Sequence, residues 1–149
     1  MSNYNINEIK FQINRIYVKD ISFEAANTPK IFHKDWNSNF KLDVYTSSYQ
    51  LSSKLFEVVL GLTVTASMDK DIAFICEVKQ AGIFNTNSIH DSQIIYFLGV
   101  YCPTILFPYG SECISNLVTR GTFPQINLAP INFDDLFHKQ SKGTLKKDN

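Results

Sequence analysis

Few side chains in this sequence have the types and spacing that catalysis or metal binding requires. The cysteines are Cys76, Cys102 and Cys113, and the histidines are His33, His90 and His138. The cysteines form no CxxC pair and no zinc pattern, and no histidine has a His or Cys partner at helical spacing. We therefore expect buried free thiols in a reducing compartment, exposed or capping histidines, and no metal site.

Two pairs of acidic residues could suggest general acid–base chemistry. Asp20 and Glu24 point the same way on a strand. At a rise of about 3.3 Å per residue they lie about 13 Å apart, which is beyond the spacing of the two carboxylates in glycosidases. Asp134 and Asp135 suit the first turn of a helix, where the helix dipole favours anions. The sequence has no GxGxxG, Walker, GxSxG or HExxH motif. We predict no catalytic site, and interpret Asp20 and Glu24 as exposed strand residues or a docking patch.

The bulk composition indicates one globular domain. The chain has 149 residues, 44% of them hydrophobic and 19% charged, with a formal net charge of zero. This excludes a strong basic field for nucleic acid, and near-zero charge mildly favours an oligomer. The chain has twelve Phe, seven Tyr and one Trp, more aromatic side chains than a domain of this size has room to bury. We therefore expect some of them at subunit interfaces or in a binding groove. We find no apolar run of about 20 residues, so we expect a cytoplasmic protein without membrane insertion.

The first half of the sequence begins with an irregular strand and a loop. Residues 10–24 carry apolar side chains mainly at odd positions, but Ile16 and Val18 interrupt the pattern, which predicts a bulge or two half-buried faces. Residues 25–36 contain a proline and predict a connecting loop that ends at Trp36.

Three further segments alternate with a period of two. Residues 39–46 predict one strand, and residues 55–67 and 72–84 predict two more. The polar segment 68–71 predicts a turn that joins the last two strands into a hairpin.

The second half predicts helices. Ser88 and Asp91 suit a capping box that opens a helix with an apolar stripe. Pro103 predicts a kink, Pro108 the start of a second helical stretch, and Gly121 its end.

The remainder is expected to be a loop, a short helix and a tail. Residues 122–131 predict an extended loop, and Asn132 a cap for a helix that ends at Lys139. We predict a domain over residues 10–139, with a flexible segment at 1–9 and a disordered tail at 140–149. Strands first and helices last predict an α+β fold with an antiparallel sheet.

Five segments resemble the SecB family in order and spacing. They are FQINRIYVKDISFEA, KDWN, FICEVKQAGIF, LGVYCPTILFPY and RGTFPQINLAPINFDDLF. The resemblance spans roughly residues 10–138. It implies a four-stranded antiparallel sheet flanked by helices, in a homotetramer built as a dimer of dimers. It also implies an export chaperone rather than an enzyme. Such a holdase binds unfolded preproteins without ATP, metal or other cofactor, keeps them competent for translocation, and delivers them to the SecA ATPase at the Sec translocon.

The resemblance also implies three sets of site residues. SecA binding is expected on a solvent-facing sheet surface at Asp20, Glu24, Ile75 and Glu77. Client binding is expected in an apolar channel at Trp36, Phe40, Leu42, Val44 and Phe137. Subunit packing is expected at Phe74, Cys76, Val78 and Gln80. For the three apolar residues at 40, 42 and 44, ordinary core packing remains an alternative to a groove.

The chain departs from the family in charge, and other functions remain open. Family members are usually acidic, whereas this chain is neutral and carries Lys54, Lys70 and Lys79 on or near the sheet. One alternative is a SecB-like chaperone of a toxin–antitoxin pair, against which Asp20, Glu24 and Glu77 argue. Others are a carrier of small apolar ligands in a closed pocket, and an enzyme of a type that no motif indicates.

Overall fold

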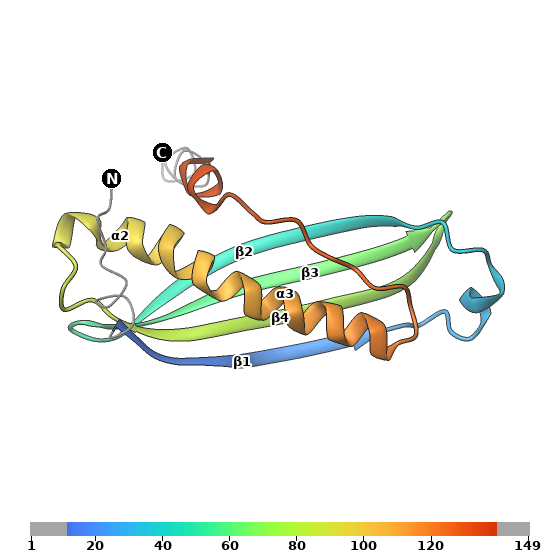
Figure 1. Ribbon diagram of the computed structural model, residues 1–149, viewed down its shortest axis with the longest axis horizontal. Helices are drawn as coiled ribbons and strands as arrows, with labels where there is room; N and C mark the ends of the chain where they lie inside the picture. The colour runs from blue at the N-terminus through green and yellow to red at the C-terminus, as the bar shows by residue number, and fades with distance from the viewer. Residues whose placement is uncertain (1–11, 140–149) are drawn as a thin grey trace.

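The computed structural model describes residues 12–139, which form a sheet covered on one face by a long helix (Figure 1). The strands and the short 3₁₀ helix between them are β1 (Ile13–Glu24), η1 (Lys30–His33), β2 (Asn39–Ser52), β3 (Leu55–Met68) and β4 (Asp71–Asn85). The strand order is β1-β4-β3-β2, and every neighbouring pair is antiparallel. This confirms the α+β fold with a four-stranded antiparallel sheet. The predicted ends, residues 1–9 and 140–149, lie outside the described residues.

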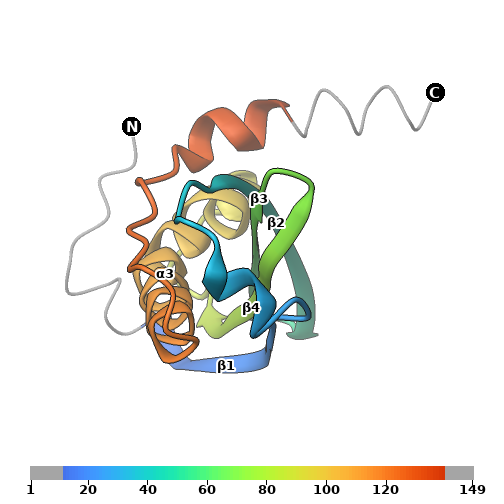
Figure 2. The same ribbon diagram turned by 90° about the vertical axis from the view of Figure 1, so that its right-hand side faces the viewer.

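One long helix follows the sheet. Its successive parts are η2 (Asp91–Gln93), α2 (Ile94–Tyr96), the π-helical turn η3 (Phe97–Tyr101) and α3 (Cys102–Arg120). Residues 123–132 then run without regular structure to a last helix at 133–139. Figure 2 shows α3 on one side of the sheet; we call this side the covered face and the other side the open face.

The β3–β4 hairpin confirms the clearest prediction from the sequence. The alternating apolar residues of both strands lie on the covered face, where Leu60, Leu62 and Val78 are fully buried. Met68 pairs with Asp71, and Asp69 adopts a positive φ of 56° in the turn. The strand predicted at 39–46 is longer than expected and continues to Ser52. Its polar second half still pairs with β3 because the ladder uses backbone groups, which no side-chain pattern reports.

A bulge divides β1, as the interrupted alternation predicted. Tyr17 pairs with Ala81 and Val18 with Gln80, but the next paired residue is Asp20, opposite Lys79. The extra residue changes which parity of residue number faces the helix. Ile16 and Ile21 can therefore both lie on the covered face although their numbers differ in parity.

The helix differs from the sequence-based expectation at its start and at its prolines. His90, rather than Ser88, is the N-cap, and no side chain among residues 12–139 caps the helix there. The Ser88 hydroxyl instead accepts a hydrogen bond from Gln12 Nε2 at 2.5 Å. The helix is also one continuous unit rather than two. The wide turn of η3 directly precedes Pro103 and gives room for the carbonyl that a proline ring would otherwise meet.

Pro108 lies inside α3 instead of starting a helix. It is exposed, as is Thr104, so water can bond the carbonyl that the proline leaves without a donor. The expected C-terminal stop at Gly121 is confirmed. Asn132 caps the last helix as predicted, since its Oδ1 accepts from the Asp135 backbone N–H at 3.1 Å.

By length and composition alone, the helix from Asp91 to Arg120 would be long and apolar enough to cross a membrane. This corrects the expectation that no segment reaches that length. Within the fold, 44% of the most apolar stretch of this helix is buried. The helix packs mainly against β3 and β4, as a core helix ordinarily does.

Candidate functional site

The four residues expected to bind SecA meet on the open face. Ile75 pairs with Glu24 and Glu77 with Ser22 across β4 and β1, and Asp20 lies on the same face one pair further along. Asp20 and Glu24 are exposed, while Ile75 and Glu77 are partly exposed. Glu24 and Glu77 therefore flank the apolar side chain of Ile75 on the face that α3 leaves free, and Asp20 lies further along the same face. We call these four residues the acidic patch.

Two neighbours modify the acidic patch. The Thr63 hydroxyl donates to Glu77 Oε2 at 3.1 Å, which orients that carboxylate. Lys79 stands directly opposite Asp20 on the same face. Opposite charges in cross-strand pairs attract, so Lys79 reduces the negative field at one end of the patch.

Further along the open face, three side chains form a closed polar network. Lys19 Nζ lies 2.7 Å from Glu57 Oε1, and the Tyr17 hydroxyl donates to Glu57 Oε2. The hydrogen bonds from Lys19 and then Tyr17 hold the pKa of the Glu57 carboxyl below its usual range. Burial, followed by the hydrogen bond to Glu57, raises the pKa of Tyr17 to about 12. The carboxylate is therefore ionised and internally satisfied at neutral pH.

The residues expected at a subunit interface are buried within a single chain. Phe74, Cys76 and Val78 have no exposed surface, and Gln80 is 3% exposed. Phe74, Cys76 and Val78 share one hydrophobic core with apolar residues of α3, and Gly110 brings the helix backbone close to Gln80. In one chain these side chains belong to the core beneath their own helix, so any part they take in assembly would act through the position of α3.

The cysteines are free thiols, two of them buried as expected. Cys76 and Cys102 are buried, whereas Cys113 on α3 is half-buried. Burial raises the pKa of Cys76 to about 11 and that of Cys102 well above its ordinary value. Burial, and then nearby Glu112, also raises the pKa of Cys113. None of the three therefore has the lowered pKa of a reactive thiolate.

An aromatic cluster gathers at one end of the covered face. Its members come from five segments of the chain: Phe23, Phe32, Trp36, Phe40, Phe74 and Phe123. Phe123 lies at the centre of the cluster: its ring centroid is 5.0 Å from that of Phe74, 5.5 Å from that of Phe32 and 5.6 Å from that of Trp36. Phe74 and Phe123 are buried, whereas Phe32 and Phe40 are 50% and 49% exposed. The cluster thus has a buried floor and an open aromatic rim.

The other expected client residues extend from this cluster or lie apart from it. Leu42 and Val44 follow Phe40 along the covered face of β2, and both are partly buried against the core. Helix α3 lies over β4 and β3, which leaves β2 at the margin (Figure 1). Phe137 contacts Tyr96 at a centroid distance of 5.7 Å and is not part of the aromatic cluster. The structure therefore brings together Trp36 and Phe40, continues to Leu42 and Val44, and separates Phe137.

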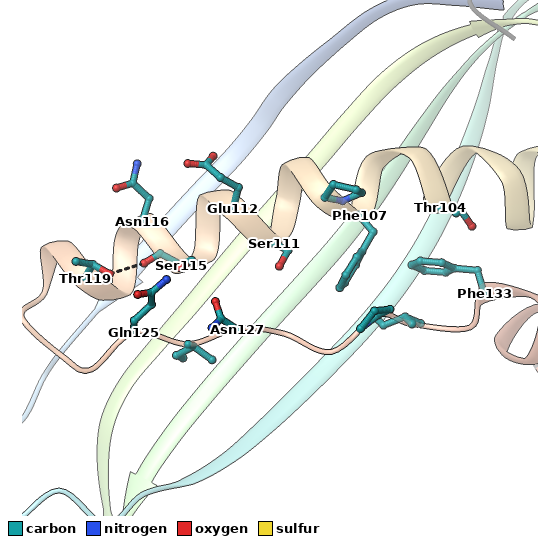
Figure 3. A pocket seen from close by; sticks show the side chains of 14 residues that line it. Thr104, Phe107, Ser111, Glu112, Ser115, Asn116, Thr119, Gln125, Asn127 and Phe133 are labelled. Atoms are coloured by element: carbon teal, nitrogen blue, oxygen red, sulfur yellow. Dashed lines mark hydrogen bonds between the residues drawn. The ribbon is translucent and has the colours of Figure 1, made fainter. Parts of the chain in front are cut away.

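A cavity of about 880 Å³ lies between α3 and the extended segment 125–133 (Figure 3). One wall is a polar face of α3, including Thr104, Ser111 and Ser115. Phe107 and Phe133 close one end, with ring centroids 6.1 Å apart. None of the expected client residues lines this cavity.

Sequence reasoning missed Phe23, Phe32 and Phe123 in the cluster, and it missed the cavity beside α3. The surplus of aromatic residues was the available signal for the first. Repeated small polar residues at helical spacing on α3 were the signal for the second. Among residues 12–139, no group of His, Cys, Asp and Glu side chains could hold a metal ion.

Comparison with solved structures supports this architecture. A SecB-like chaperone from Mycobacterium tuberculosis, in complex with a peptide from the HigA1 antitoxin, matches with a TM-score of 0.62 and 14% identity over 80% of this chain and 89% of that chain. A protein of unknown function from Streptococcus agalactiae matches with 13% identity over 78% of this chain and 94% of that one, at a TM-score of 0.35, too low to indicate a shared fold.

The family comparison covers nearly the whole chain. The family described as preprotein translocase subunit SecB matches residues 5–144. This range includes the open-face patch, the aromatic cluster and α3. The chain therefore belongs to the SecB family.

Proposed function

We propose that this protein is a cytoplasmic export chaperone that holds preproteins unfolded and delivers them to SecA. Membership of the SecB family supports the chaperone role itself. The observation that carries the proposal is that the two faces of the sheet carry surfaces of different chemistry. An apolar aromatic surface opens on the covered side, and an acidic surface lies on the other side of the same sheet.

The client site is the aromatic cluster continued by Leu42 and Val44. Half-exposed Phe32 and Phe40 over a buried aromatic floor offer apolar surface without any built-in side-chain specificity. Such a surface favours extended segments rich in aromatic and aliphatic residues, because burial of apolar area does not depend on sequence. Phe137 is a separate candidate contact at the other end of this margin.

Holding clients requires no nucleotide in this proposal. The sequence has no phosphate-binding loop, and the candidate client surface gains its energy from burial of apolar area. The test is arrest of refolding of a slow-folding preprotein by the purified chain, without ATP. Folding of the preprotein at its unassisted rate with the chaperone in excess would contradict the proposal.

A homotetramer built as a dimer of dimers is part of the proposal. Val18 and Ile21 on edge strand β1 are 45% and 43% exposed, so a single chain leaves apolar surface uncovered there. Phe74, Cys76, Val78 and Gln80 would support assembly by fixing α3. Sedimentation as a monomer at micromolar concentration would contradict this part of the proposal.

One observation favours a second function. The matching M. tuberculosis chaperone is bound to an antitoxin peptide, so a client from a toxin–antitoxin pair is an alternative. That function needs the aromatic surface but not the acidic patch. Direct binding of the full chain to SecA from the same organism separates the two, because only the export function requires it.

A further inference from the structure

The open face carries, further along β1 and β4 from the acidic patch, a hollow that neither the sequence nor the family resemblance assigned. It has a volume of about 680 Å³ and lies over the opposite ends of the same strands. Val59 and Ile83 form its floor, and Tyr49 and Leu51 stand at its rim. Ile83 is six residues beyond Glu77 on β4, which places it about 20 Å along the strand at about 3.3 Å per residue.

The hollow suits an uncharged apolar group. Among the described residues that line it, Lys19 and Glu57 alone are charged, and they pair with each other at 2.7 Å. Tyr17 bonds the second carboxylate oxygen of Glu57, so an occupant need not desolvate an unpaired charge. Tyr49 is 69% exposed and Leu51 46% exposed, which is apolar surface without a partner in the described chain.

We propose that the protein partner that docks its basic surface on the acidic patch also inserts an apolar side chain into this hollow. The inference rests on the proposed SecA docking and adds an anchor to it. The carboxylates of the acidic patch suit a basic protein surface, and the open face runs without interruption from Glu77 to Ile83, which favours this occupant over a client segment. The client surface lies on the opposite side of the sheet.

The two parts of the surface have different kinetic roles. Exposed charges accelerate encounter and depend on salt, whereas a desolvated apolar anchor lengthens the life of the complex. A partner anchored here therefore leaves slowly once docked, and its escape depends little on ionic strength. Loss of the anchor thus differs measurably from loss of the patch.

The experiment measures association and dissociation of SecA with the full-length chain carrying Tyr49→Ala or Leu51→Ser. Tyr49 is largely exposed and Leu51 nearly half exposed, so neither change removes a buried core group. We expect dissociation at least about fivefold faster, as for truncation of an interface hot spot, and association within about twofold of wild type. Tyr49→Phe, which keeps the ring, should retain wild-type dissociation. Ile95→Ser is the control, because Ile95 is 74% exposed on α2 and lies outside both surfaces.

Four other outcomes would contradict the proposed anchor, and each can be distinguished from the rest. Dissociation of Tyr49→Ala and Leu51→Ser at the rate of Ile95→Ser, while Glu77→Lys weakens binding, would leave the docking proposal intact and remove the anchor alone. Loss of client arrest with unchanged SecA kinetics would assign the hollow to clients, and a change in particle mass would assign it to a second copy of the chain. Absence of SecA binding by the wild-type chain would remove the docking proposal itself.

Discussion

The side-chain amide of Gln80 donates a hydrogen bond to the backbone carbonyl of Tyr17 at 3.0 Å. The bond reaches from beneath α3 to the point where β1 bulges between Val18 and Asp20. It satisfies a backbone acceptor next to the bulge and gives a buried amide its partner. Because the bulge turns Asp20 and Glu24 onto the open face, a core side chain supports the geometry of the acidic patch.

Gln80→Ala should therefore lower the free energy of unfolding by about 0.5–1.5 kcal/mol, the net contribution of a typical hydrogen bond, because the Tyr17 carbonyl that loses its donor is only part-buried. Equilibrium urea unfolding measures the change. Gln50→Ala is the matched control, because the exposed Gln50 amide makes only a 3.4 Å contact with the Ser53 carbonyl. Equal losses in the two variants would show that the bond to Tyr17 contributes nothing.

The sequence was informative where structure depends on local periodicity. The strict alternation in β3 and β4 predicted both strands and their hairpin, because a buried face demands a period of two. The interrupted alternation in β1 predicted the bulge but not its position, which depends on pairing with β4. The helix breaks expected at Pro103 and Pro108 were wrong. Packing of α3 on the sheet and the π-helical turn before Pro103 outweigh the cost of a proline inside a helix.

The candidate site was predictable only in part. Placement of Asp20, Glu24, Ile75 and Glu77 on one surface followed from family resemblance and the parity of each strand. The aromatic cluster joins residues from distant segments, and no local pattern indicates that Phe123 would be its centre. The open-face hollow depends on the polar end of β2, whose pairing the sequence pattern did not reveal.

Cys76→Tyr should shift the proposed tetramer toward dimers. Cys76 has no exposed surface beneath α3, so a larger side chain must displace the helix, typically at a cost of about 1–3 kcal/mol. Sedimentation velocity measures the assembly, and Cys76→Ala controls for loss of the thiol without overpacking. An unchanged tetramer in the folded tyrosine variant would contradict transmission through α3.

Phe40→Ala should weaken arrest of preprotein refolding while the chain stays folded. Phe40 is 49% exposed at the rim of the aromatic cluster, so truncation removes contact surface more than core packing. Tyr109→Ala is the control, as an aromatic truncation at 52% exposure on α3. Truncating Leu42 and Val44 extends the test along β2. If those variants unfold instead of losing client capture, the core interpretation of these residues is correct.

Thiol alkylation should be slow near neutral pH and should begin at Cys113. A raised pKa leaves less of the reactive thiolate, and its fraction grows as pH rises toward that pKa. Cys76, with a pKa of about 11, and the more deeply buried Cys102 should lag behind half-buried Cys113 in the native chain. Mass spectrometry after timed iodoacetamide treatment at pH 7 and pH 9 gives the order. Faster modification of Cys76 would show that α3 opens readily from the sheet.

Glu77→Lys should slow SecA association and leave client arrest unchanged. Glu77 lies on the open face, where its carboxylate is held by the Thr63 hydroxyl, whereas the aromatic cluster occupies the covered side. Exposed interfacial charges act mainly on encounter and specificity, so the association rate should change most. The defect should shrink at high salt, since the Debye length falls to about 3 Å at 1 M.

Thr63→Val, which removes only the orienting hydroxyl, should give a smaller defect with the same salt dependence. The measurement is stopped-flow SecA binding beside refolding arrest for each variant. Loss of client arrest with intact SecA binding would mean that the two faces have been assigned the wrong way round.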